Sequence, residues 1–231
     1  MLRGPPTVTR PVDFRGACSA IQAGGTCALD AAGLVPTLLV YADGADCVAR
    51  GISFRNAASY AWGAGQPKGA FAAGALAGAV SVLGGASVRI QDCEFSGNKG
   101  DSGGALRVQD AGSRVAVERT TFTDNRGLSN GGSVSVEAAV GTFTNCTFQG
   151  SSALFGGGMA IARAATVNLE NPAFGNNTAD VFGDDVYVDD PNQSLLQSSP
   201  FPLNINIYPS STGSRFLAPP SPPPTPPYPI T

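Results

Sequence analysis

The chain has 231 residues, of which 42% are hydrophobic and 13% charged, and its formal net charge is −3. This balance gives no basic surface excess of the kind that captures nucleic acid or anionic lipid, so we expect no nucleic-acid partner. The chain also has no histidine, which excludes histidine acid–base catalysis, Ser-His-Asp and Cys-His nucleophiles, and histidine metal sites. Its 30 glycines and 18 prolines, with recurrent Val, Thr and Asn, favour an all-β fold of short strands and tight turns.

Residues 1–37 predict an irregular N-terminal coil or cap. Their first residues include a cation but no apolar stretch typical of a secretory signal, so either the protein is not exported by that route or the chain is part of a longer protein. Cys18 and Cys27 flank a glycine-containing loop and are candidates for a disulfide, which would need an oxidising compartment. No apolar run in the chain reaches about 18 residues, so we expect no membrane span.

A repeat occupies residues 38–190. Its phenylalanines are 27, 26 and 26 residues apart, at Phe95, Phe122, Phe148 and Phe174. The aligned segments are VRIQDCEFSGN, VAVERTTFTDN, GTFTNCTFQGS and VNLENPAFGNN. Apolar and polar residues alternate before each phenylalanine, which indicates a strand with one buried and one solvated face. Glycines then introduce a second strand in each unit, in GGALRV, GGSVSV, GGGMAI and GDDVYV.

The fixed period near 26 residues predicts a solenoid, a single-stranded parallel β-helix of about five or more coils. An earlier copy centres on Phe54 and is interrupted by an insertion near residues 57–73. Equivalent strands would pair about 4.8 Å apart, so the phenylalanines would stack in a ladder. The asparagines three residues after them, Asn98, Asn125 and Asn177, would form an amide ladder and close their corner in the left-handed conformation. The glycines would lie at corners that need positive φ or close backbone approach.

The remaining cysteines are expected to be buried small hydrophobic residues. Cys93 and Cys146 hold the same inward repeat position two coils apart, about 10 Å, which is too far for a disulfide. Cys47 falls where other coils have Val88 or Val115, so it is also expected to face the core.

Two segments follow the repeat. Residues 191–217 contain PLNINIY, in which Leu203, Ile205 and Ile207 alternate with polar residues, and predict a closing strand that caps the open end. Residues 218–231, APPSPPPTPPYPIT, predict a flexible tail in the extended polyproline II conformation.

The repeat resembles a known family. FSGN, FTDN and FGNN followed by GGAL or GGSV look like the paired FxxN and GGA(I/L/V) repeats of the polymorphic outer-membrane proteins and related extracellular right-handed parallel β-helices of the pectin-lyase-like superfamily. The resemblance covers about residues 38–190, although FQGS lacks the asparagine and GDDVYV lacks the second glycine. It implies a right-handed β-helix at the cell surface or outside the cell. The proline-rich end also resembles the hydroxyproline-rich spacers of plant and green-algal wall proteins.

Acidic residues are the candidates for chemistry. Enzymes with this fold use clustered acids and cations, but the GHG and RIK motifs of polygalacturonases are missing, and no calcium-binding carboxylates align with an arginine base as in pectate lyases. A possible Ca²⁺ site is formed by the aspartates near the end of the repeat, Asp184, Asp185, Asp189 and Asp190. The alternative is a solvated corner at the end of the solenoid. Because adjacent residues of a strand point to opposite faces, Asp184 and Asp185 fit a glycosidase pair poorly.

The insertion supplies candidates for binding. Tyr60, Trp62 and Lys68 would stack on sugar rings or anchor a partner protein, unless Trp62 folds back over the edge of a coil. Three asparagines, Asn145, Asn176 and Asn192, match the glycosylation acceptor pattern.

These observations favour a non-catalytic extracellular, cell-surface or cell-wall module for adhesion or for binding carbohydrate or protein. We expect it to be a monomeric part of a longer chain, without a cofactor other than possible Ca²⁺. One alternative is a calcium-assisted polysaccharide lyase or glycoside hydrolase that acts on pectin-like polymers. The other is a purely structural spacer.

Overall fold

Every regular element in the described part of the protein is a β-strand. The structure, a computed structural model, describes residues 46–59, 77–163 and 165–189 together with the backbone of five further strands. These strands are β1 (Thr7–Val8), β2 (Val12–Arg15), β3 (Cys27–Asp30), β4 (Leu38–Tyr41) and β24 (Asn204–Tyr208). Within these ranges no helix is long and apolar enough to cross a membrane.

Four strands make one complete coil. The coil around Phe95 consists of β8 (Ser87–Gln91), β9 (Glu94–Ser96), β10 (Lys99–Ser102) and β11 (Leu106–Gln109). The next coil consists of β12 (Arg114–Glu118), β13 (Thr121–Thr123), β14 (Arg126–Asn130) and β15 (Val134–Glu137). The third consists of β16 (Val140–Thr144), β17 (Thr147–Gln149), β18 (Ser152–Phe155) and β19 (Met159–Ala162). The fourth consists of β20 (Thr166–Glu170), β21 (Ala173–Gly175), β22 (Thr178–Phe182) and β23 (Val186–Asp189). Before them lie β5 (Asp46–Arg50), β6 (Ile52–Arg55) and β7 (Val80–Leu83).

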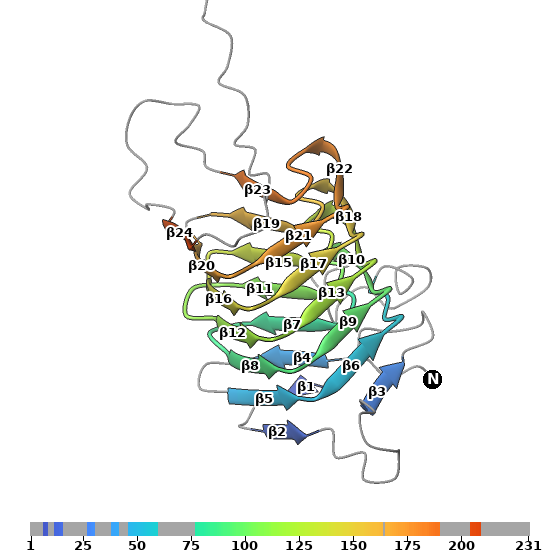
Figure 1. The fold of residues 1–231 in the computed structure, drawn as a ribbon. Helices are drawn as coiled ribbons and strands as arrows, with labels where there is room; N and C mark the ends of the chain where they lie inside the picture. The colour runs from blue at the N-terminus through green and yellow to red at the C-terminus, as the bar shows by residue number, and fades with distance from the viewer. Residues whose placement is uncertain are drawn as a thin grey trace, which may run out of the picture.

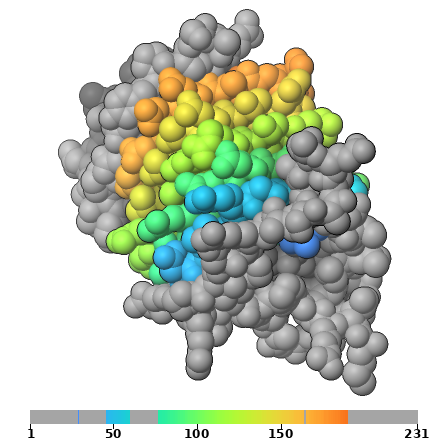
Figure 2. All heavy atoms as spheres, turned by 60° about the horizontal axis from the view of Figure 1, so that its bottom comes forward, coloured from blue at the N-terminus to red at the C-terminus, as the bar shows by residue number. Residues whose placement is uncertain are grey.

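Equivalent strands of successive coils pair in parallel and form four sheets (Figure 1). Sheet 1 has the order β2-β5-β8-β12-β16-β20-β24, and sheet 2 has the order β3-β6-β9-β13-β17-β21. Sheet 3 has the order β10-β14-β18-β22, and sheet 4 has the order β1-β4-β7-β11-β15-β19-β23. The predicted solenoid is therefore confirmed as an all-β parallel β-helix with four complete coils. In a space-filling view these coils form successive bands across the face that Figure 2 shows.

Strands also lie on both sides of the repeat. β1, β2 and β3 fall within residues 1–37 and pair in parallel with β4, β5 and β6, so this segment continues the sheets of the solenoid. At the other end β24 pairs with β20, which places a strand where the sequence predicts a closing one. In this pair Ile205 is opposite Val167 and Ile207 is opposite Leu169.

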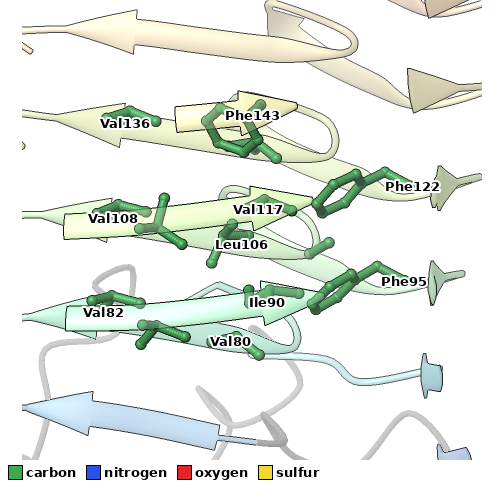
Figure 3. Packing of buried hydrophobic residues seen from close by; sticks show 14 of the residues in the cluster. Val80, Val82, Ile90, Phe95, Leu106, Val108, Val117, Phe122, Val136 and Phe143 are labelled. Atoms are coloured by element: carbon green, nitrogen blue, oxygen red, sulfur yellow. The ribbon is translucent and has the colours of Figure 1, made fainter. Parts of the chain in front are cut away.

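The core consists of rows of apolar side chains that run along the solenoid axis (Figure 3). Phe54, Phe95, Phe122, Phe148 and Phe174 are register partners in sheet 2, and successive ring centroids are 4.7, 4.9, 5.0 and 4.8 Å apart. The first four of these rings are at most 1% exposed. The expected stack is thus present and extends by one coil to Phe54. Cys47, Cys93 and Cys146 are reduced thiols buried in the same core.

The corner after each phenylalanine differs from the prediction in one respect. The left-handed residue is the one before the ladder position, at Asn56, Gly97, Asp124, Gly150 and Asn176, with φ between 52° and 64°. Asn98, Asn125 and Asn177 are therefore not the residues with positive φ, and that part of the prediction is wrong. The reason is steric, since the left-handed residue turns the chain so that the next side chain points into the coil. The first glycine of each later corner does have positive φ, at Gly103, Gly131, Gly156 and Gly183.

Candidate functional site

The buried amide ladder uses its polar groups internally. Asn98 Nδ2 donates to Phe54 O and to Asn125 Oδ1, both at 3.0 Å. Asn125 Nδ2 in turn donates to Phe95 O at 3.0 Å. Ser151 fills the next rung, and its N–H donates to Asn177 Oδ1 at 3.0 Å. These groups hold neighbouring coils together and are not available to a ligand.

Two of the aspartates considered as calcium ligands lie at the C-terminal end of this ladder, next to Asn177. The Asp185 carboxylate accepts a hydrogen bond from Asn177 Nδ2 at 3.0 Å, and Asp184 Oδ1 accepts one from the Ala179 N–H at 2.9 Å. Asp189 ends β23, and Asp190 lies outside the described residues. In the part of the chain that the structure describes, no three His, Cys, Asp or Glu side chains are grouped as metal ligands would be. Asp184 and Asp185 thus have structural partners at this end of the solenoid.

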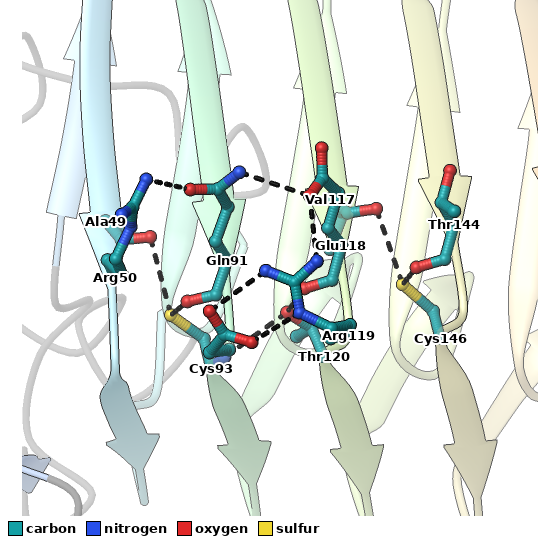
Figure 4. Close-up of polar contacts among 11 residues, drawn as sticks. Ala49, Arg50, Gln91, Cys93, Val117, Glu118, Arg119, Thr120, Thr144 and Cys146 are labelled. Carbon is teal, nitrogen blue, oxygen red and sulfur yellow. Dashed lines mark hydrogen bonds and ion pairs between the residues drawn. The ribbon is translucent and has the colours of Figure 1, made fainter.

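Charged side chains on the corner between sheets 1 and 2 neutralise one another (Figure 4). Arg119 contacts both carboxylate oxygens of Asp92, at 2.6 and 3.0 Å, and donates to Glu118 at 3.1 Å. Its hydrogen bonds lower the pKa of Asp92, and the same pair raises the pKa of Arg119. Gln91 continues the row by donating to Glu118 at 3.2 Å and by accepting from Arg50. This row is therefore an ion-paired seam across the coils and not a surface of one sign.

The buried thiols are unsuited to nucleophilic chemistry. Cys93 Sγ donates to Gln91 O at 3.2 Å, and Cys146 Sγ donates to Thr144 O at 3.4 Å (Figure 4). Burial raises the pKa of Cys93, and it raises the pKa of Cys146 to about 11. Both thiols therefore stay protonated near neutral pH. The Cys18–Cys27 disulfide prediction concerns side chains outside the described residues.

The glycosylation candidates include two exposed corner residues. Asn145 and Asn176 are both exposed and both have positive φ, 53° and 54°. The Asn145 Oδ1 accepts a hydrogen bond from Asn171 Nδ2 at 3.2 Å. Asn192 lies outside the described residues. An attached glycan at either described position would project away from the core.

The insertion leaves and rejoins the solenoid beside sheet 3. Before it, the Ser59 N–H donates to Lys99 O on β10 at 2.9 Å, and after it the Gly78 N–H donates to Gly103 O at 3.2 Å. Tyr60, Trp62 and Lys68 lie outside the described residues. Their predicted role stays a prediction, but both ends of their loop are fixed next to one sheet.

The most unusual exposed surface lies farther along the same sheet. Phe155 on β18 has its ring centroid 6.4 Å from Phe182 on β22 and 5.0 Å from Tyr187 on β23. We call these three side chains, together with the exposed Leu128 on β14 and Val181 on β22 of the same sheet as the phenylalanines, the aromatic surface. Leu128, Val181 and Phe182 are 46%, 45% and 40% exposed. Exposed groups of large apolar side chains in folded proteins typically mark binding surfaces.

One register column explains why the two phenylalanines of this surface occur only in the last two complete coils. Ser102, Asn130, Phe155 and Phe182 are successive partners in sheet 3, so the column changes from polar to aromatic after the second complete coil. Burial raises the pKa of the adjacent Tyr187 phenol, and the Asp189 carboxylate adds to the effect. Tyr187 therefore keeps its proton near neutral pH and contributes a hydroxyl donor beside the rings. Sequence reasoning missed this surface, because the column depends on register shifts in sheet 3 that no local pattern signals.

Comparison with known proteins identifies the fold family. Residues 42–199 match the family model described as the right-handed beta helix region. Searches among curated proteins and among solved structures found no significant match to the chain.

Proposed function

We propose that this chain, which belongs to the right-handed β-helix family, is a non-catalytic binding module that docks a partner protein on the aromatic surface. The observation that carries this proposal is the cluster of Phe155, Phe182 and Tyr187, with two exposed aliphatic side chains, Leu128 and Val181, on strands of sheet 3. Phenylalanine and aliphatic side chains offer area for hydrophobic burial but few hydrogen-bonding groups. This composition favours a protein partner over a polysaccharide, which would need more polar contacts around each ring.

A cell-surface or cell-wall location is part of the same proposal. It is supported by the resemblance of the repeat to extracellular β-helices and by two exposed asparagines, Asn145 and Asn176, in glycosylation acceptor sequences. The chemistry of the described residues supports a non-catalytic role. The Asp184 and Asp185 carboxylates have structural partners, and the Cys93 and Cys146 thiols are buried, with raised pKa values.

The test uses a peptide array and a glycan array with three forms of the full chain. These are the wild type, Phe182→Ser, and the control Thr123→Ser on the outer face of sheet 2. We expect the wild type and the control to bind a subset of peptides, with at least a tenfold loss in Phe182→Ser. Far-UV circular dichroism checks that the variant keeps its β-structure.

The competing enzyme hypothesis has its own readout. Incubation of the chain with pectin and Ca²⁺ would release unsaturated or reducing ends if the protein were a lyase or hydrolase. Turnover that disappears in Asp184→Ala and Asp185→Ala would overturn the proposal. Binding to glycans that is unchanged in Phe182→Ser would contradict the assignment of the surface.

A further inference from the structure

The geometry of the aromatic surface suits an extended proline-rich chain. Its two phenylalanines come from adjacent coils and lie side by side, and Tyr187 borders Phe155 on the next sheet. Proline-rich segments in the polyproline II conformation dock on such exposed aromatic rings, because their rings present flat apolar faces at regular spacing. Their backbone is already extended, so binding costs little conformational entropy.

The chain itself contains a segment of this kind. Residues 218–231, APPSPPPTPPYPIT, have eight prolines and no charged side chain. Burying this segment against apolar rings therefore removes no charge from water. A charged segment would pay a large desolvation cost on the same surface, where Phe155, Phe182 and Val181 offer no counter-charge.

The segment is also within reach. β24 ends at Tyr208, which is the register partner of Glu170. Glu170 is the last residue of β20, and β20 lies in the same coil as β22, which carries Phe182. The nine residues 209–217 span up to about 30 Å when extended. The path from Glu170 to Phe182 is twelve residues long and turns at two corners, so the straight distance is well below its extended length of about 40 Å. A short linker also gives an effective concentration in the millimolar range, which allows a weak contact to be occupied.

We propose that residues 218–231 dock on the aromatic surface of their own chain as a polyproline II segment. This inference rests on the proposed function, because it assigns the chemical class that the surface recognises. It makes the tail an internal ligand, which an external proline-rich partner displaces by binding the same rings.

The test compares hydrogen exchange in the full chain and in a variant whose eight tail prolines are all changed to serine. We expect the variant to exchange faster in β22 and β23, with no change in β13 and β17 on sheet 2. A synthetic APPSPPPTPPYPIT peptide should bind the serine variant with a Kd between about 10 μM and 1 mM, the range of weak modular contacts. The peptide should bind at least tenfold more weakly when Phe182→Ser is added.

The outcomes separate this inference from the proposed function. If the serine variant exchanges like the wild type and the peptide does not bind, the tail is not the ligand, although array binding that depends on Phe182 would still support the function. If Phe182→Ser alters neither peptide binding nor array binding, both proposals fail.

Docking within one chain also requires the wild type to remain monomeric by analytical ultracentrifugation, and tail-dependent dimers would overturn the proposed docking. Leu128→Ser serves as a second surface variant in case Phe182→Ser unfolds the last coil.

Discussion

At the scale of single residues, the amide ladder shows why asparagine recurs at one position. Asn98 and Asn125 are at most 1% exposed, and each amide accepts a hydrogen bond from a backbone N–H and donates one to a backbone carbonyl of the preceding coil. Only a side chain with both a donor and an acceptor at the right distance can do this. Ser151 fills one rung with a shorter side chain, and Ser133 compensates by placing its hydroxyl 2.7 Å from that of Ser151.

The first prediction concerns Asn125. In Asn125→Ala, the Asn98 N–H loses its acceptor and Phe95 O loses its side-chain donor, both in the buried interior. Unsatisfied buried polar groups destabilise by roughly 1–3 kcal/mol each, so we expect a loss of about 2–4 kcal/mol in the free energy of unfolding. Urea denaturation followed by circular dichroism measures it. The control Gln149→Ala, at an exposed position of β17, should change stability by less than about 0.5 kcal/mol. Equal stability of the two variants would contradict a stabilising role for the ladder.

At the scale of strands and corners, close backbone packing explains the second glycine of the corner motif. A Cβ built on Gly104 would lie 2.1 Å from Gly132 O, and one on Gly132 would lie 2.0 Å from Gly157 O. No side chain fits at these contacts, because each glycine faces the carbonyl of the next coil. Asp184 occupies the same position in the last complete coil, where no described strand of sheet 3 or sheet 4 follows.

The second prediction therefore compares two glycines. Gly132→Ala forces the backbones of two coils apart, and we expect a loss of at least about 3 kcal/mol or failure to fold. Gly175→Ala is the matched control, since a Cβ built on Gly175 would meet no atom within 4 Å and the φ of this glycine is not positive. Thermal unfolding of both variants gives the comparison. A Gly132→Ala protein as stable as Gly175→Ala would show that the coils can separate at this corner without cost.

The same elements show what sequence patterns can predict. The 26-residue period predicts one strand that runs into each phenylalanine and a second strand after the glycines, which together correspond to sheets 1, 2 and 4. In the structure the first of these strands is divided between sheets 1 and 2 by a corner residue with positive φ, such as Asp92 or Asn145. Sheet 3 was not predicted, since strands such as KGDS in β10 and RGLSN in β14 are mostly polar, contain a glycine and lack regular apolar alternation. Their pairing is imposed by the coils on either side, and it contains register shifts that no local pattern signals. The aromatic surface lies on this sheet, so it was missed for the same reason.

At the scale of the whole molecule, a solenoid is stabilised mainly by contacts between neighbouring coils, so its ends decide whether it stays soluble. An uncovered edge presents a row of free N–H and C=O groups that invites pairing with another chain. In the described residues, the edges of the four sheets at the last coil are protected in different ways. β24 covers β20 in sheet 1, whereas Asp184 and Asp185 place carboxylates at the end of sheets 3 and 4. Charge at an edge discourages a further strand from adding there.

The third prediction tests the role of β24. Ile205 and Ile207 hold the register positions opposite the buried Val167 and Leu169, so polar residues there would weaken the contact of β24 with the end of the core. We expect the double variant Ile205→Ser and Ile207→Ser to exchange backbone amides in β20 at least tenfold faster and to aggregate at concentrations where the wild type does not. Asn204→Ser with Asn206→Ser, at the alternate register positions of the same strand, is the control and should behave like the wild type. Hydrogen exchange with mass spectrometry and light scattering provide the two readouts. If the isoleucine variant keeps wild-type exchange in β20, then β24 does not protect this edge, and the remaining coils are stable without a closing strand.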